Sequence, residues 1–150
     1  MARAHRRHFD IDLEWDGSGR AALSSRHAAI IGALSPGQDA GWTSEDLLLS
    51  SLSLCLTSAF RALAAREDID VARYHCRTEA TVGDVKAGLG SRPGFTFITV
   101  QLDVTVAPEH VQRARELMVE AKHHCLIANA LMPPVHLEMA VVAEPVGALA

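Results

Sequence analysis

Several features that mark specialised proteins are scarce in this 150-residue sequence, beginning with cysteine. Three cysteines are an odd number and cannot form the closed disulfide framework of a small secreted domain. Basic residues are not in excess either, because 14 Lys and Arg stand against 18 Asp and Glu, for a formal net charge of −4. Nucleic-acid-binding domains are usually clearly basic. We therefore expect thiols that are reduced at rest and no nucleic-acid partner.

A long uninterrupted hydrophobic run is also missing. The longest apolar stretch, residues 47–60, is interrupted by hydroxyl side chains and is too short and too polar for a membrane span. The basic cluster at the start of the chain (Arg3, Arg6 and Arg7, with His5 and His8) is not followed by the apolar region of a secretory signal. We expect a cytoplasmic protein with no membrane association.

Motifs for cofactors and metals are likewise not found. The sequence contains no glycine-rich phosphate loop and no Ser/His/Asp signature. His123 and His124 stand beside Cys125, but adjacent histidines point to different faces of a helix, and no Cys-x2-Cys or His-x3-His spacing occurs. We expect no metal site and no bound cofactor.

What is present is ordinary globular composition, with 49% hydrophobic and 21% charged residues. The length is the commonest for one domain, and no repeat or linker divides the chain. We therefore predict a single domain over residues 1–150.

The N-terminal half predicts strands followed by a long helix. Apolar and polar residues alternate over 8–15, and two short strands are expected near 20–25 and 27–31, followed by a loop over 34–42. Thr43-Ser44-Glu45-Asp46 is a helix start, with a hydroxyl cap and carboxylates in the first turn. The helix is predicted to run to Arg66, and its nearly all-round apolar character predicts a central, buried position.

The C-terminal half predicts strands at 72–82 and 98–106, separated by a loop with several glycines over 83–94. Pro108 opens a helix whose expected inner stripe is Val111, Ala114, Met118, Ala121 and Cys125. Pro133-Pro134 ends the helical region, and a last strand is expected over 135–141. The predicted fold class is α+β, with the long central helix packed on mostly antiparallel sheets.

The cysteines are the candidate reactive groups, although each is also explained as packing. A cysteine in an apolar helix, such as Cys55 or Cys125, is usually an inert core residue, and Cys76 lies on the apolar face of a strand. Thiolate chemistry requires a nearby cation, which sequence spacing alone does not supply.

The patterns around Cys55 and Cys125 resemble the OsmC/Ohr family of thiol-dependent hydroperoxide reductases. Residues 42–56, WTSEDLLLSSLSLCL, are similar to that family's helix-opening segment, with a leucine run before the reactive cysteine. Residues 121–131, AKHHCLIANAL, resemble its second cysteine segment and are followed by Pro134-Val135. The resemblance extends over residues 8–142 and implies an OsmC-like fold that forms an intertwined homodimer with shared active sites.

The resemblance implies a division of roles. Cys55 is the peroxidatic thiol that reduces a small hydrophobic organic hydroperoxide, and Cys125 is the resolving thiol that closes a disulfide with it. An external dithiol of dihydrolipoyl type, for example on a lipoylated protein, then restores both thiols. Relatives also use an arginine from the N-terminal strands, for which Arg20 is preferred here over Arg26, held by a glutamate at the position of Glu45.

Two alternatives stay open. Glu45 is explained equally well as a first-turn carboxylate that stabilises the helix, because ten residues of a straight helix rise about 15 Å and separate it from Cys55. The chain could also be an OsmC-fold binding or redox-sensing protein with little or no peroxidase turnover. A redox-inert interaction module would require that both cysteines be sealed from solvent.

Overall fold

The computed structural model describes residues 12–15, 20–25, 28–34 and 41–144. The chain forms two compact units, Met1–Leu48 and Leu49–Ala150. The prediction of one domain over residues 1–150 therefore stays a prediction. The basic N-terminal cluster, residues 8–11 of the first expected strand and Arg26 lie outside the described residues.

The first unit contains a three-stranded antiparallel sheet in the order β1-β2-β3. Its strands are β1 (Asp12–Trp15), β2 (Arg20–Ser24) and β3 (Ala29–Ala33), close to the predicted positions. Trp42 extends this unit by a parallel bridge to Gly32. The chain passes so near β3 at Gly41 that a Cβ there would lie 2.9 Å from the Ile31 carbonyl oxygen, so this position requires glycine.

Helix α1 (Ser44–Arg66) has the predicted bounds and the predicted start. The Thr43 side chain accepts from the Asp46 N–H, and the Asp46 carboxylate accepts from the Thr43 N–H, which is a reciprocal capping box. The residues that face the core are Leu52, Leu56, Phe60 and Ala64, at a spacing of four. The prediction of a buried helix is confirmed for this face only, because Leu54 on another face is 69% exposed.

By length and composition alone, α1 is also apolar enough to cross a membrane, with a mean hydropathy of 1.6 over its best window. The helix is longer than the apolar stretch of residues 47–60 on which the sequence argument against a membrane span relied. Core helices pass the same test, which makes it weak evidence. The packing of Leu52, Leu56 and Phe60 into the cluster of buried residues is the behaviour of a core helix.

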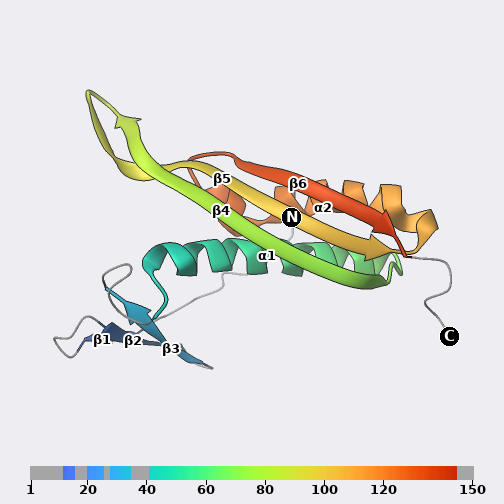
Figure 1. The fold of residues 1–150 in the computed structure, drawn as a ribbon, viewed down its shortest axis with the longest axis horizontal. Coiled ribbons are helices and arrows are strands. Elements are labelled where there is room, and N and C mark those ends of the chain that lie inside the picture. Colours follow the sequence, from blue (N-terminus) through green and yellow to red (C-terminus); the bar gives the residue numbers. More distant parts are fainter. Residues whose placement is uncertain (1–11, 16–19, 26–27, 35–40, 145–150) are drawn as a thin grey trace, which may run out of the picture. The chain divides into compact units, whose positions relative to one another are not determined.

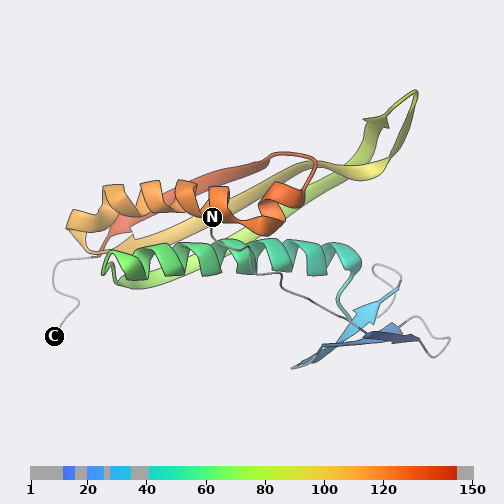
Figure 2. The same ribbon diagram turned by 180° about the vertical axis from the view of Figure 1, so that it is seen from behind.

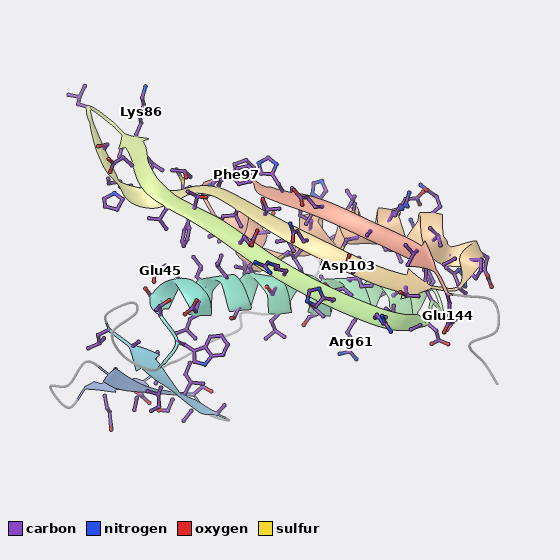
Figure 3. The ribbon with its side chains drawn as sticks, viewed as in Figure 1. Glu45, Arg61, Lys86, Phe97, Asp103 and Glu144 are labelled. Atoms are coloured by element: carbon purple, nitrogen blue, oxygen red, sulfur yellow. The ribbon has the colours of Figure 1, made fainter. Side chains whose placement is uncertain are left out.

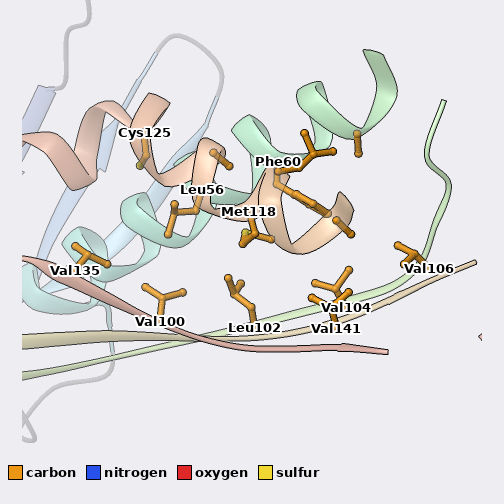
Figure 4. Packing of buried hydrophobic residues seen from close by; sticks show 14 of the residues in the cluster. Leu56, Phe60, Val100, Leu102, Val104, Val106, Met118, Cys125, Val135 and Val141 are labelled. Carbon is orange, nitrogen blue, oxygen red and sulfur yellow. The ribbon is translucent and has the colours of Figure 1, made fainter. Parts of the chain in front are cut away.

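The second unit is built on a sheet in the order β4-β5-β6. Strands β4 (Val71–Ala87) and β5 (Gly90–Val106) are antiparallel, and β6 (Val135–Ala143) pairs parallel to β5. Figures 1 and 2 show α1 and α2 (Val111–His124) along the same face of this sheet. The buried side chains between them form one core, shown in Figure 4, with Val100, Leu102 and Val104 on its sheet side.

The prediction of a loop over residues 83–94 is wrong. Both strands continue through it and pair as far as Ala87 and Gly90, leaving only Gly88 and Leu89 as the hairpin turn. Gly88 has φ 61, a conformation that glycine adopts without cost at the first position of a tight hairpin turn. A bulge between Thr81 and Val82 breaks the register of the hairpin.

The predicted helix from Pro108 is also more divided than expected. A short 3-10 turn (Pro108–His110) leads into α2, and a separate short helix, α3, covers Leu126–Ala130. Ala114, Met118 and Ala121 of the predicted inner stripe are buried, together with Leu117, whereas Val111 is only half-buried. Cys125 is buried but does not belong to either helix, which corrects its predicted mid-helix position.

Candidate active site

Cys55 lies on one flank of α1 and is half-buried against the core. Leu52 and Leu56 are buried in the core, and Ser53 points to β4, where its hydroxyl lies 2.7 Å from that of Thr78. Residue 55 is about 200° around the helix from residue 53. The Cys55 side chain therefore leaves α1 on the flank opposite to β4.

Cys125 occupies the break between α2 and α3. Its backbone is extended, with φ −76° and ψ 108°, and its side chain is 0% exposed. The sulfur accepts a hydrogen bond from the backbone N–H of Ala128 at 3.4 Å, so the thiol caps α3. Figure 4 shows Cys125 in the helical layer above Leu56 and Val135.

The pKa of Cys125 reflects both its burial and the nearby Cys55 side chain. Burial raises the pKa of the Cys125 thiol to about 11, because the thiolate would lose its water. A hydrogen bond and an electrostatic interaction with the Cys55 side chain raise this pKa further, whereas the Ala128 N–H lowers it. The two thiols therefore lie near each other, and Cys125 is protonated at neutral pH.

Cys76 lies elsewhere, on the side of β4 that faces α1. It is half-buried, and its sulfur is 4.0 Å from the hydroxyl oxygen of Thr78. Because Thr78 bonds Ser53 on one flank of α1 and Cys55 leaves the other flank, the helix stands between Cys76 and Cys55.

Sequence reasoning missed a row of hydroxyl groups that joins α1 to β4. The Thr57 hydroxyl donates to the Ser53 carbonyl (2.7 Å) and is hydrogen-bonded to the Tyr74 hydroxyl (3.1 Å). Burial raises the pKa of Tyr74 to about 12. The available signal was the spacing of four between Ser53 and Thr57, matched by Tyr74 and Thr78 on one face of a strand.

Glu45 is exposed in the first turn of α1 (Figure 3). A hydrogen bond to its own backbone N–H, followed by one from the Ser44 hydroxyl at 2.9 Å, lowers the pKa of its carboxyl. These contacts are those of a first-turn carboxylate that stabilises the helix. The predicted role in holding an arginine stays a prediction.

The described part of the structure does not show whether Arg20 or Arg26 lies near the thiols. Arg20 begins β2 in the first unit, without a described side chain, and Arg26 lies outside the described residues. Arg61 of α1 is exposed (Figure 3), and Lys122 of α2 is half-buried. Activation of Cys55 by Arg20 therefore stays a prediction.

Within the described parts of the chain, no group of three or more His, Cys, Asp or Glu side chains could hold a metal ion. His123 and His124 are both exposed. The arrangement at Cys55 and Cys125 consists of two thiols, one sealed and one with partial access to solvent. Such a pair can form a disulfide after oxidation of the accessible thiol.

Solved structures with the same fold are known from several bacteria. An OsmC-like protein of unknown function from Vibrio cholerae superposes with a TM-score of 0.78 at 18% identity, over 90% of this chain and 100% of that one. An OsmC-like protein from Mycoplasma pneumoniae gives 0.78 at 15% identity, over 91% and 98%. An organic hydroperoxide resistance protein from Elizabethkingia anophelis gives 0.66 at 16% identity, over 93% and 98%. These similarities confirm the predicted α+β, OsmC-like fold.

A search of curated protein sequences returned no match. The sequence profile of the family described as OsmC-like protein matches residues 37–140, which include both Cys55 and Cys125. Because this match spans well over half of the chain, the protein belongs to the OsmC-like family.

Proposed function

We propose that the protein is a thiol-dependent peroxidase that reduces organic hydroperoxides. The observation that carries the proposal is that a half-buried thiol, Cys55, lies near a second thiol, Cys125, which is sealed from solvent. Membership of the OsmC-like family and the structural likeness to an organic hydroperoxide resistance protein support it.

The reaction begins at Cys55. Its thiolate attacks the distal oxygen of the hydroperoxide, the O–O bond breaks, and the leaving alkoxide takes a proton to become the alcohol. Cys55 is then a sulfenic acid. The Cys125 thiol attacks the sulfenic sulfur, water leaves, and a Cys55–Cys125 disulfide closes.

The assignment of the two roles follows from access. Cys125 is 0% exposed and its pKa is raised to about 11, so it is a poor first nucleophile toward a dissolved peroxide. Cys55 has partial access to solvent. Its surroundings are apolar, with Leu52, Leu56 and Phe60 on the same helix, which favours a small hydrophobic hydroperoxide over hydrogen peroxide.

Two further components complete the proposal. Arg20 activates the Cys55 thiol, with Glu45 as its orienting carboxylate, and the chain acts as a homodimer in the cytoplasm. An external dithiol of dihydrolipoyl type reduces the disulfide by exchange, which yields two thiols and the oxidised dithiol. Arg20→Ala should slow alkylation of Cys55 at neutral pH, and Glu45→Ala should do so less; Arg26→Ala is the matched control.

The experiment that tests the roles of the two cysteines is the intact mass of the reduced protein after one equivalent of tert-butyl hydroperoxide. We expect a loss of two hydrogen atoms without a gain of oxygen, and peptide mapping that joins Cys55 to Cys125. Cys125→Ser should instead gain one oxygen, and Cys55→Ser should no longer consume peroxide. Cys76→Ser is the matched control and should behave as the parent; an unchanged rate in Cys55→Ser would overturn the assignment.

A redox-sensing protein with the same two cysteines is the alternative. The raised pKa of Cys125 favours it, because a protonated thiol exchanges slowly. Both functions predict the same disulfide, so the distinguishing measurement is turnover with excess peroxide and dihydrolipoamide. Continued consumption of peroxide over many equivalents supports the peroxidase, and a single equivalent supports the sensor.

A further inference from the structure

A groove of about 620 Å³ lies away from the cysteines, in the second unit. One wall is the far end of the β4–β5 hairpin, and the other is the segment that follows α3. Pairing between β5 and β6 starts at Ile98, so residues 90–97 extend beyond β6, as Figure 1 shows. The hairpin and the α3–β6 connection thus form a groove that neither Cys55 nor Cys125 lines.

The groove has apolar, rigid walls. Phe95, Leu131 and Met132 line it, and Met132 is 86% exposed. Of the six prolines in the chain, three line this groove, namely Pro93, Pro133 and Pro134. Proline fixes its own φ, so these walls lose little conformational freedom when a ligand binds.

Two cations also line the groove. They are Lys86, which projects near the tip of the hairpin in Figure 3, and Arg92. Neither forms an ion pair or a hydrogen bond with the side chains that the structure describes, and no described lining residue is acidic. An apolar groove lined by two cations and by no described acidic residue matches a molecule with an apolar body and one negative charge.

We propose that this groove binds an amphipathic monocarboxylate, with its apolar body against Phe95, Leu131 and Met132 and its carboxylate near Lys86 and Arg92. The groove is a site separate from the thiol pair, and its ligand needs no peroxide group. The proposal therefore goes beyond the peroxidase function and does not depend on it.

The experiment is a titration of the reduced full-length protein with decanoate, followed by NMR of isotope-labelled methionine methyl groups. The Met132 methyl should shift in a saturable manner, while the fully buried Met118 should not move. We expect decanol to bind about threefold or more weakly than decanoate, because it has no charge for the cations. Lys86→Gln and Arg92→Gln should each weaken decanoate by a similar factor and leave decanol unchanged.

Arg73→Gln is the matched control, an exposed cation on the same strand as Lys86 and outside the groove. Equal affinities for decanol and decanoate would overturn the proposal, as would a response of Met118 without Met132. Binding to anionic vesicles with no response to monomeric decanoate would overturn it as well. Decanoate is not a hydroperoxide, so each result is independent of whether Cys55 turns over peroxide.

Discussion

At the scale of single residues, Cys55 and Cys125 differ in what surrounds their sulfurs. Cys125 is enclosed by the core and caps α3, whereas Cys55 keeps partial access to solvent. Burial disfavours the charged form of a thiol, so the pKa of the enclosed Cys125 is raised above the ordinary value of a thiol. In the proposed mechanism, the same asymmetry keeps Cys125 protonated until a sulfenic acid forms at Cys55.

Alkylation of Cys125 should therefore show an alkaline midpoint. In Cys76→Ser protein, we expect iodoacetamide to label Cys125 with a midpoint near its pKa of about 11, rather than at the ordinary value of 9.0. Cys55→Ser should move the midpoint down, because the Cys55 side chain raises the pKa of Cys125. Peptide mass spectrometry over a range of pH measures both midpoints. Half-labelling of Cys125 at pH 9.0 in the Cys76→Ser protein would contradict the prediction.

Tyr74 offers a second titration, and it is the only tyrosine in the chain. Burial raises its pKa to about 12, so tyrosinate absorbance should appear later than in the unfolded protein. Because the folded pKa lies above the unfolded one, this group's contribution to stability is complete below about pH 10 and is lost as the pH rises toward 12. Thr57→Val should raise the pKa further, since the Thr57 hydrogen bond lowers it; Ser58→Ala is the control.

Individual residues were predictable from the sequence only where local pattern decides their position. The apolar helix around Cys55 follows from periodicity, as does the capping role of Thr43. The interruption between α2 and α3 at Cys125 could not be predicted in this way. No glycine or proline marks it, and the cap of α3 depends on one hydrogen bond from the Ala128 N–H. A cation at Cys55 depends on contacts between distant segments, which periodicity does not encode.

At the scale of elements, the same contrast separates helix α1 from the β4–β5 hairpin. Helix α1 carries its own start and stop signals, and both of its ends were predicted. The hairpin has the glycine and proline content of a loop over residues 83–94, but its strands pair through that stretch. Pairing between strands is set by the partner strand, so composition alone was misleading there.

At the C-terminal end of α1, replacement of Asp68 by glycine should increase the stability of the fold. Ile69 N–H bonds to the Ala64 carbonyl and Asp68 N–H to the Ala65 carbonyl, which is the Schellman pattern, with Asp68 at φ 53. An L-residue is strained in this left-handed region. Asp68→Gly should therefore raise the free energy of unfolding by about 0.5–1 kcal/mol, which is the strain of about 1–2 kcal/mol less the extra entropy of glycine in the unfolded chain.

Chemical denaturation measures this change, and Asp70→Gly is the matched control, since Asp70 does not have a positive φ. We expect Asp70→Gly to be neutral or destabilising. Destabilisation by Asp68→Gly would show that the carboxylate contributes more than the strain costs.

At the scale of the whole molecule, the two units differ in how much core each possesses. Of the described residues of the first unit, only Ala21 and Gly32 are buried, while Ile31 is 40% exposed and Trp42 49% exposed. The second unit has a continuous core but leaves Leu54 of α1 69% exposed. Single exposed apolar side chains are common on protein surfaces, and a contiguous apolar patch is what usually marks a surface covered by a partner.

The family resemblance implies a homodimer, and we expect α1 to contribute to its interface through the exposed Leu54 side chain. Burial of one leucine side chain contributes about 1.5–3 kcal/mol, and a twofold axis counts each substitution twice. Leu54→Glu should thus weaken dimerisation by about 3 kcal/mol or more, which is roughly 100-fold or more in the dissociation constant. Analytical ultracentrifugation at micromolar concentration measures it, with Val119→Glu, an exposed apolar site on α2, as the matched control. A folded parent that sediments as a monomer would refute the dimer, and equal effects of the two substitutions would remove α1 from the interface.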